Sequence, residues 1–244
     1  SHCCMMSTST AVLAFSFTPQ SLRSKPRTYS GSIVLLETTF TISPFSFWQV
    51  NRAQAERLYA KAREYAALTG NETLLDLYCG TGTIGLSMAK DCKSLIGVEL
   101  IADAVRDAEH NAMVNSICNA RFLCADAPQA AAQLDREGVM PDVVILDPPA
   151  FTKAHANMAN ACRGYKEIAL SAMRLLPPGG VLATHSCSYH MPEDVFVNTV
   201  LSAAQDLHRQ VRVITLRRQD IDHPVLAGYP ESHYLKSLWL QMLD

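Results

Sequence analysis

The fold is decided by the stretch Asp76-Leu77-Tyr78-Cys79-Gly80-Thr81-Gly82-Thr83-Ile84-Gly85, which places a glycine-rich turn between an apolar strand and a helix. The strand is predicted over residues 73–78. The Gly-x-Gly-x-x-Gly spacing is typical of the turn that opens the first helix of a nucleotide-binding α/β sheet. Dinucleotide-binding domains share this spacing, so further residues have to identify the ligand.

Strands and helices alternate along the chain after this turn. Apolar runs predict strands over Thr73–Tyr78, Ser94–Glu99, Ala120–Ala125, Asp142–Asp147, Gly180–Ser186, Val211–Leu216 and Leu235–Met242. Helices are predicted in the gaps, most clearly over Ile101–Ser116, Cys162–Leu176 and Pro192–Leu207. Such alternation indicates a parallel sheet covered by helices on both faces. We therefore expect an α/β fold with a doubly wound, seven-stranded, mostly parallel sheet of the Rossmann-like type.

The region before residue 73 divides into two parts. Residues 1–32 are rich in Ser and Thr and contain no Asp or Glu, which predicts a poorly ordered tail. An acid-poor start is also found in organellar transit peptides, and that alternative stays open. Residues 33–72 hold two short strands, Ile33–Leu36 and Thr39–Ile42, and a helix over Asn51–Leu68 that leads into the main domain, residues 73–244.

Composition limits the classes of function. The 244 residues are 48% apolar and 18% charged, which is ordinary for a globular domain. No apolar run approaches the roughly 18 residues of a membrane helix. The eight cysteines are irregularly spaced, which indicates reduced thiols in the cytoplasm and no metal site. With a net charge of −2, any RNA would be held by local basic patches, or by a separate RNA-binding module or partner.

Acidic residues at the strand ends favour S-adenosyl-L-methionine (SAM) as the cofactor. Asp76 lies inside the strand before Gly80 and Gly82, where a carboxylate can hold the methionine amino group. Glu99 ends the second strand, where it can accept both ribose hydroxyls, and Asp126 follows the third strand near the expected adenine amine. Each acid alone is also explained as a helix cap or a solvated strand end. Together they predict a class I SAM-dependent methyltransferase domain, whose last strand is antiparallel.

The first half of the chain resembles the RNA uracil-5-methyltransferases. The resemblance covers residues 33–147 and is carried by Thr41-Ile42-Ser43-Pro44-Phe45-Ser46-Phe47-Trp48-Gln49-Val50-Asn51 and by the later stretch LLDLYCGTGTIGLSMA. It implies that SAM or the target base is contacted by Gln49, Tyr78, Thr83, Glu99, Asp126 and Asp147. Thr83 replaces the Asn that is often found at its position. Phe47, Trp48 or Tyr78 would stack on the base.

The second half, residues 147–242, resembles the catalytic domain of the 23S rRNA cytosine-5-methyltransferases. The similarity lies in Asp147-Pro148-Pro149-Ala150-Phe151, Ala161–Lys166, Ser186-Cys187-Ser188, Asp222-His223-Pro224, Tyr229-Pro230-Glu231 and Tyr234-Leu235-Lys236. Both families carry their nucleophilic Cys on the same strand, which implies that Cys187 is catalytic. RNA is therefore the expected partner, with rRNA favoured over tRNA.

The expected mechanism is covalent catalysis on a flipped-out base. The Cys187 thiolate would add to pyrimidine carbon 6, Asp147 would hydrogen-bond the nitrogen edge of the ring, and carbon 5 would then take the methyl group. His185 lies two residues from Cys187 on the same strand face, where it can assist the thiol or pack under the helices. The alternative for Cys187 is a small buried core residue.

The base that is methylated is less sharply specified. Uracil enzymes use a Glu on the last strand to remove the ring proton, and Lys236 stands at that position here. A protonated Lys cannot act as a base unless burial strongly lowers its pKa, and Glu231 is the best remaining carboxylate. Gln49 tolerates both pyrimidines. Cytosine is therefore favoured slightly over uracil.

Several alternatives stay open. The chain could be an RNA guanine amino-group methyltransferase, which would have no use for Cys187, or a small-molecule methyltransferase. A chain that joins halves of two families could also bind SAM without catalysis. Two basic groups are candidates for phosphate contacts: Arg163, Lys166 and Arg174, expected near one another on one helix, and Arg217 with Arg218.

Overall fold

The computed structural model describes residues 31–42, 52–151, 157–219, 223–229 and 232–244. Its strands are β1 (Gly31–Leu35), β2 (Thr38–Ile42), β3 (Thr73–Leu77), β4 (Ser94–Glu99), β5 (Ala120–Cys124), β6 (Val143–Leu146), β7 (Val181–Ser186), β8 (Val211–Arg218) and β9 (Lys236–Met242). Its helices are α1 (Arg52–Ala66), α2 (Thr83–Met88), α3 (Ala102–Val114), α4 (Ala127–Arg136), α5 (Met158–Leu175) and α6 (Glu193–Asp206), with a 3₁₀ turn at Ala89–Asp91.

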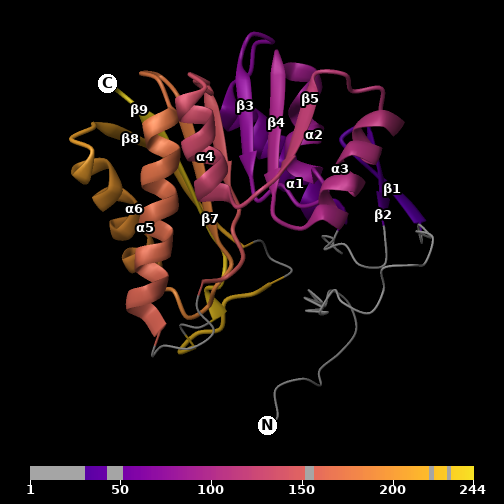
Figure 1. The fold of residues 1–244 in the computed structure, drawn as a ribbon. Helices are drawn as coiled ribbons and strands as arrows, with labels where there is room; N and C mark the ends of the chain where they lie inside the picture. Colours follow the sequence, from indigo (N-terminus) through magenta and orange to yellow (C-terminus); the bar gives the residue numbers. More distant parts are fainter. Residues whose placement is uncertain (1–30, 43–51, 152–156, 220–222, 230–231) are drawn as a thin grey trace.

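Seven strands form one twisted sheet in the order β5-β4-β3-β6-β7-β9-β8 (Figure 1). The neighbours from β5 to β7 are parallel. The last strand, β9, lies between β7 and β8 and is antiparallel to both. This confirms the predicted doubly wound sheet with an antiparallel last strand.

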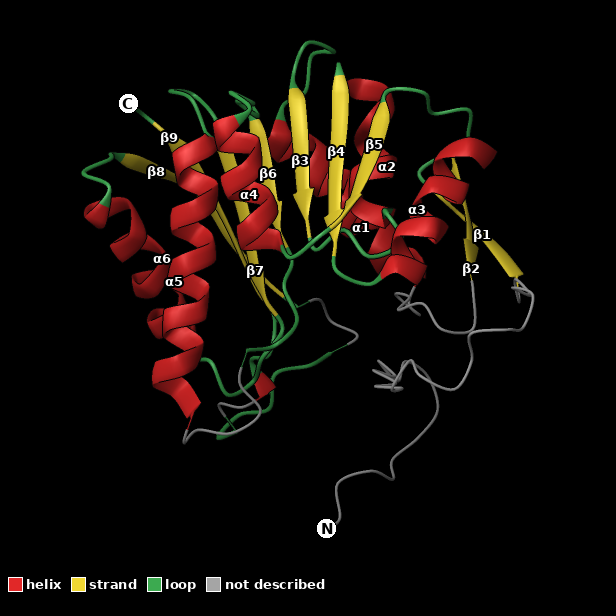
Figure 2. Ribbon diagram, in the orientation of Figure 1, coloured by secondary structure: helices red, strands yellow, loops and turns green. Residues whose placement is uncertain are grey.

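Helices cover both faces of the sheet (Figure 2). On one face, α4, α5 and α6 bury a core that includes Leu75, Val144, Leu182 and Phe196. On the other face, α1, α2 and α3 pack over Leu74, Ile145 and Trp239. β6 is buried along its whole length, as its apolar sequence predicts for a strand covered on both faces.

The hairpin of β1 and β2 is attached to this core. Leu35 and Phe40 are fully buried in the same cluster as Tyr59 of α1. Two asparagines of α3 act as partners for the edge of β2: the Asn115 side chain bonds both backbone groups of Thr39, at 2.7 and 2.6 Å, and Asn111 Oδ1 accepts from Thr41 N at 2.8 Å. The hairpin and the main domain therefore share one core.

The predicted bounds lie within two residues of the structure, except for the start of α5. β1 begins at Gly31, so the strand includes two residues that were assigned to the tail. α5 begins at Met158, four residues before the predicted start at Cys162. β8 continues to Arg218, because Arg217 and Arg218 keep pairing with β9. Residues 1–30 lie outside the described part of the chain.

Candidate active site

The carboxyl ends of the parallel strands meet at a topological switch point. β3 lies in the middle of the sheet, the chain moves outward through β4 and β5, and it then returns to β6 on the other side of β3. In open α/β sheets of this kind, ligands bind outside the strand ends at such a point. The segments after β3, β4, β6 and β7 carry most of the residues that the sequence singles out.

The glycine-rich turn after β3 has a backbone that requires its glycines. Gly80 and Gly82 adopt positive φ angles of 56° and 81°. A Cβ on Gly82 would lie 2.9 Å from Leu86 Cδ1 and 3.2 Å from the Ala108 Cβ atom, so a side chain there would clash. Gly82 also begins α2, and its amide bonds the Cys79 carbonyl at 2.8 Å. The turn thus exposes backbone at the switch point without side chains in the way.

Asp76 is a buried carboxylate with one unpaired oxygen. Its Oδ2 accepts from the Gly85 amide at 3.0 Å, whereas Oδ1 has no hydrogen-bond partner among the described residues. Burial, together with the charges of Asp147 and Glu99, raises its pKa to about 8. A buried carboxylate oxygen without a partner needs a hydrogen-bond donor. The methionine ammonium of SAM meets that need, so this residue fits the expected cofactor.

Glu99 is held by the turn that it faces. Its Oε2 accepts from the Gly80 amide at 3.1 Å and its Oε1 accepts from the Ile101 amide at 2.9 Å. These bonds fix the carboxylate at the end of β4, where the remaining lone pairs suit paired hydroxyl donors. The geometry fits a ribose.

Tyr78 and Asp126 lie beside Glu99. Burial raises the pKa of Tyr78 to about 12, with further contributions from the charges of Asp126 and Glu99. Asp126 is the residue before α4 and is partly buried. Tyr78 is therefore within electrostatic range of two of the acids that the sequence assigns to the cofactor.

Asp147 ends β6 and lies on the same sheet face as Asp76. The β6–β7 register pairs Leu146 with Thr184, so Asp147 and His185 are next to each other across the two strands. Burial raises the pKa of Asp147, and His185 opposes this shift. His185 is buried and lies edge-on to Trp239, with ring centroids 6.2 Å apart. The electrostatic partner of His185 is Asp147, and assistance by His185 to Cys187 gains no support.

Cys187 follows β7 and is exposed. Partial burial of its sulfur and the charge of Asp147 raise its pKa, while Lys236 and a hydrogen bond from the Ala150 backbone lower it. The thiol is therefore in contact with the Asp-Pro-Pro-Ala loop that follows β6. It is not the small buried core residue that was its alternative.

Two tyrosines belong to this site, and the sequence did not assign either a role. Tyr59 of α1 is 2% exposed, bonds the Thr83 side chain, and lies within electrostatic range of Asp147 and Asp76. Its only sequence signal is a hydroxyl on the buried, alanine-rich face of a helix.

The second is Tyr165 of α5, whose hydroxyl donates to Ser186 Oγ at 2.9 Å. Its ring contacts Phe151, with centroids 4.7 Å apart, and the Phe151 backbone bonds its hydroxyl. Tyr165 thus links the loop after Asp147 to β7, the strand that Cys187 follows.

Lys236 is buried beside Cys187. Its Nζ donates to the Ser188 carbonyl at 2.5 Å and to the Tyr234 carbonyl at 3.0 Å. Burial lowers its pKa to about 8, and the charges of Cys187 and Glu193 act in the opposite direction. Among the described residues of the site, the last strand therefore carries a lysine and not the carboxylate that uracil enzymes use.

The predicted basic groups are not gathered at the site. Arg163 and Arg174 are separated by about 16 Å along α5, because a helix rises about 1.5 Å per residue. The expectation that they lie near each other is wrong. Lys166 pairs with Asp206 of α6 at 2.8 Å.

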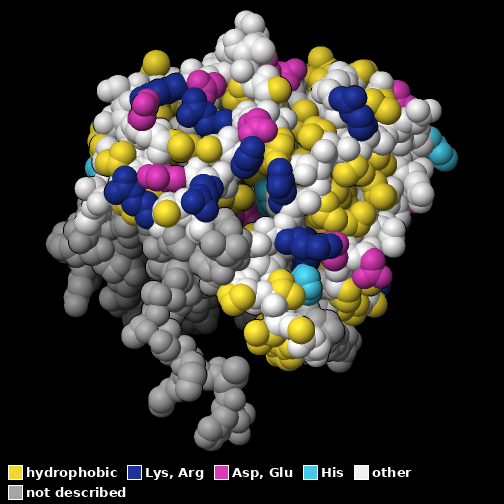
Figure 3. Space-filling model, turned by 180° about the vertical axis from the view of Figure 1, so that it is seen from behind, with side chains coloured by type: hydrophobic (Ala, Val, Ile, Leu, Met, Phe, Trp, Pro, Cys, Tyr) yellow, Lys and Arg dark blue, Asp and Glu magenta, His cyan; other side chains and the backbone are white. Residues whose placement is uncertain are grey.

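The other basic pair is also engaged by the protein. Arg217 donates to the Tyr65 hydroxyl at 2.6 and 2.9 Å, and Arg218 pairs with Glu193. Figure 3 shows that the Lys and Arg side chains on this side of the molecule are interspersed with Asp and Glu. Gln49, Phe47, Trp48 and Glu231 lie outside the described residues.

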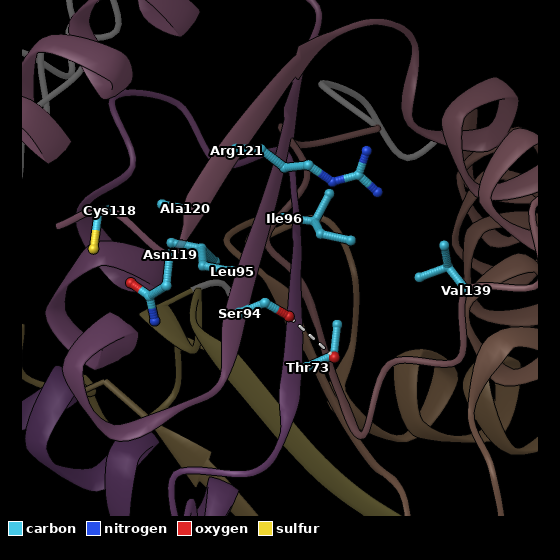
Figure 4. A pocket seen from close by; sticks show the side chains of 9 residues that line it. All are labelled: Thr73, Ser94, Leu95, Ile96, Cys118, Asn119, Ala120, Arg121 and Val139. Atoms are coloured by element: carbon cyan, nitrogen blue, oxygen red, sulfur yellow. Dashed lines mark hydrogen bonds between the residues drawn. The ribbon is translucent and has the colours of Figure 1, made fainter.

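A shallow hollow lies at the opposite end of the sheet (Figure 4). Thr73, Ser94 and Ala120, which begin β3, β4 and β5, line it together with Asn119 and Arg121. Because it opens at the amino ends of the strands, it is separate from the glycine-rich turn and Cys187.

No helix among the described residues is long and apolar enough to cross a membrane.

Comparison with known proteins gives the same picture. An uncharacterized RNA methyltransferase from Staphylococcus aureus is 50% identical over 115 residues, which are 47% of this chain and 25% of that protein. Ribosomal RNA large subunit methyltransferase I from Shewanella amazonensis is 38% identical over 196 residues, which are 78% of this chain and 50% of that protein. The chain thus spans between a quarter and half of the length of these relatives.

Two solved structures share the fold. The crystal structure of SMU.776 in complex with SAH has a TM-score of 0.72 at 14% identity, over 90% of this chain and 58% of that one. The Pyrococcus abyssi tRNA (uracil-54, C5)-methyltransferase in complex with S-adenosyl-L-homocysteine has a TM-score of 0.57 at 23% identity, over 86% and 43%.

The sequence also matches the methyltransferase domain family over residues 68–229, which span all strands from β3 to β8. This match confirms the predicted cofactor, SAM. With the glycine-rich turn, the unpaired Asp76 carboxylate and the seven-stranded sheet, it establishes that the chain belongs to the methyltransferase domain family.

Proposed function

We propose that the chain is the catalytic part of a SAM-dependent RNA methyltransferase that adds a methyl group to carbon 5 of a pyrimidine in ribosomal RNA. The names of the two relatives, an RNA methyltransferase and a ribosomal RNA methyltransferase, support RNA as the substrate. Carbon 5 and the covalent route rest on the residues of this chain.

The observation that carries the proposal is the position of Cys187. Its thiol is exposed at the carboxyl end of β7 and is hydrogen-bonded by the Ala150 backbone in the loop after Asp147. A nucleophile and an acid thus face the same end of the sheet as the cofactor residues. An amino-group or small-molecule methyltransferase has no use for this thiol, since those reactions need no covalent adduct with the substrate.

The cofactor is proposed to bind along the strand ends. Asp76 would hold its ammonium group, Glu99 its ribose hydroxyls, and Asp126 its adenine amine. Gly80 and Gly82 would let the backbone approach, and Tyr78 and Thr83 would border the bound molecule. Gln49, which is outside the described residues, would complete this set. When bound, SAM supplies an electrophilic methyl group.

The residues of the chain would activate the base. The Cys187 thiolate adds to carbon 6, which forms a carbon–sulfur bond and moves the electron pair of the 5,6 double bond toward carbon 5 and the ring. Carbon 5 would then take the methyl group, and the bond from the methyl group to the cofactor sulfur would break to leave S-adenosylhomocysteine. Transfer of the carbon-5 proton to a base would regenerate the double bond and expel the thiolate.

Cytosine is favoured slightly over uracil. The second half of the chain resembles the cytosine-5-methyltransferases, and Lys236 stands where uracil enzymes use a Glu. Asp147 would hydrogen-bond the nitrogen edge of the ring, and burial raises the pKa of this carboxyl group. We therefore propose 5-methylcytidine as the product.

The test is to incubate the protein with isotopically labelled SAM and unmodified ribosomal RNA, digest the RNA, and identify the labelled nucleoside by mass spectrometry. We expect labelled 5-methylcytidine. Labelled 5-methyluridine would keep the role of Cys187 and overturn the preference for cytosine. Labelled methylguanosine, or labelling of small molecules only, would contradict the proposed function.

A further inference from the structure

Lys236 occupies an unusual position for a lysine. It begins β9, pairs with Ser186 at the last rung of β7, and is only 1% exposed. Lysine is almost never fully buried unless its charge is matched. Two of its three N–H donors are taken by the Ser188 and Tyr234 carbonyls, and no acceptor among the described residues takes the third.

The anion best placed to match this charge is the thiolate of Cys187. Two groups interact electrostatically with Lys236 as anions, Cys187 and Glu193. Glu193 is already bound by the Arg218 guanidinium through both of its oxygens, at 2.5 and 2.6 Å. Such bidentate pairing satisfies the carboxylate and leaves it less available to a second cation. Among the described residues, Lys236 is the only cation that acts on the thiolate.

The hydrogen bonds of Lys236 also fix the backbone next to Cys187. The Ser188 carbonyl lies one residue after Cys187, and the hydrogen bond of 2.5 Å ties it to β9. On its other side, Ser186 accepts a bond from Tyr165. Cys187 is therefore held between two fixed residues, with the ammonium on the side of Ser188.

We propose that Lys236 is a positioning residue for Cys187: it ties the turn after β7 to β9 and keeps a cation beside the thiolate that attacks the base. This inference rests on the proposed function for its biological meaning. The titratable groups around the pair are Asp147 after β6, Tyr165 of α5, His185 of β7, Glu193 of α6 and Arg218 of β8. Burial and Asp147 raise the pKa of the thiol, and Lys236 opposes part of this shift.

The test is the pH profile of Cys187 alkylation in the full chain. Wild type and Lys236→Met are treated with iodoacetamide between pH 6 and 10, and the rate at each cysteine is measured by peptide mass spectrometry. Methionine keeps the length and burial of the side chain and removes the charge. Lys236 is charged below its pKa of about 8, so its charge acts on Cys187 in the lower part of the profile. We expect the Cys187 rate at pH 7.5 to fall about tenfold in Lys236→Met and the midpoint to rise, because loss of a neighbouring opposite charge raises a thiol pKa by about one unit.

Cys118 is the internal control, since it is exposed and belongs to the far end of the sheet. Its profile should be the same in both proteins. If Lys236 only holds the backbone, Lys236→Met will lower the melting temperature and leave the Cys187 midpoint unchanged. That result would overturn the proposal.

A second variant covers the case in which Lys236→Met does not fold. In Cys187→Ser the change is at an exposed position, and the pKa of Lys236 is followed by NMR of ¹³C-labelled lysine. The coupling predicts a lower Lys236 pKa in Cys187→Ser than in wild type, because the thiolate stabilises the ammonium. Equal values would contradict the inference.

Neither titration involves RNA. If the two titrations are coupled and no pyrimidine is methylated, the proposed function fails and the contact between Lys236 and Cys187 stands. If pyrimidine methylation is found and the titrations are independent, only the inference about Lys236 fails.

Discussion

The two halves of the strand-end surface differ in charge. Around β3 and β4, Asp76 and Glu99 face a glycine-rich turn, and the unpaired oxygen of Asp76 calls for a hydrogen-bond donor. Around β7 and β9, the exposed thiol of Cys187 lies beside the buried Lys236. In the proposed function, one half binds the positively charged cofactor and the other carries the thiolate that attacks the base. The difference predicts that variants in one half change cofactor affinity, whereas variants in the other change catalysis.

The largest effect is expected in the nucleophile half. Cys187→Ser should lower methyl transfer to RNA at least about a thousandfold, because serine is a far weaker nucleophile at neutral pH. Affinity for SAM, measured by calorimetry, should change less than twofold, since the thiol acts on the base. Cys118→Ser is the matched control and should keep full activity. Strongly reduced SAM affinity in Cys187→Ser would contradict the assignment of cofactor binding to one half and catalysis to the other.

In the cofactor half, Asp76→Asn should weaken SAM binding by about 2 kcal/mol, the usual value for a hydrogen bond to a charged group. Asparagine keeps the shape of the side chain and loses the anion that pairs with the ammonium. Calorimetry on the variant gives the difference directly. Unchanged affinity would show that the ammonium is held elsewhere.

The pH dependence of SAM binding separates the halves further. The ligand-free pKa of Asp76 is about 8, and a cationic ligand favours the ionised carboxylate. SAM affinity should therefore rise between pH 6 and 8, by at most about tenfold per unit for one released proton. Asp76→Asn should flatten this slope, and Cys187→Ser should retain it. A slope that persists in Asp76→Asn would assign the proton to another group.

The sign is reversed for the stability of the ligand-free protein. The folded pKa of Asp76 lies above the ordinary carboxyl value of 3.8, so its protonated form stabilises the fold. This contribution is present at low pH and is lost as pH rises from about 4 to about 8. Denaturant unfolding of wild type and Asp76→Asn at pH 5 and 8 should show the variant gaining relative stability at pH 8.

The smallest effect is expected at Tyr59. Tyr59→Phe removes the hydroxyl that bonds Thr83 while it keeps the buried ring, and it should weaken SAM binding by about 1 kcal/mol. The melting temperature of the ligand-free protein is the control for packing. An effect on methyl transfer without one on SAM affinity would move Tyr59 to the nucleophile half.

The sequence predicts the sheet better than the site. β4 is predicted with its observed bounds because an apolar run ends at an acid, and the parallel sheet follows from the alternation with helices. The start of α5 was missed although Asn157, a favoured N-cap residue, precedes Met158; its side chain makes no capping hydrogen bond in the structure. Glu99 and Cys187 could be found because motifs mark them.

The remaining contacts depend on how distant elements pack. In the sequence, Tyr59 is only one residue of an amphipathic helix, and its contact with Thr83 depends on how α1 packs over β3 and β6. The hydrogen bond of Tyr165 likewise depends on how α5 packs against the end of β7. In the sequence, Lys236 is noticed only because it stands where uracil enzymes carry a Glu. Its contacts with the Ser188 and Tyr234 carbonyls arise from the β7–β9 register, which sequence spacing does not specify.

The most direct test of the central claim is covalent trapping at Cys187. Ribosomal RNA transcribed with 5-fluorocytidine is incubated with the protein and SAM, and the adduct is mapped by mass spectrometry. Fluorine at carbon 5 cannot leave as a proton does, so the carbon–sulfur bond should persist. We predict a methylated RNA adduct on Cys187 in wild type and none in Cys187→Ser. Methyl transfer to normal cytidine with no adduct on Cys187 would contradict the account.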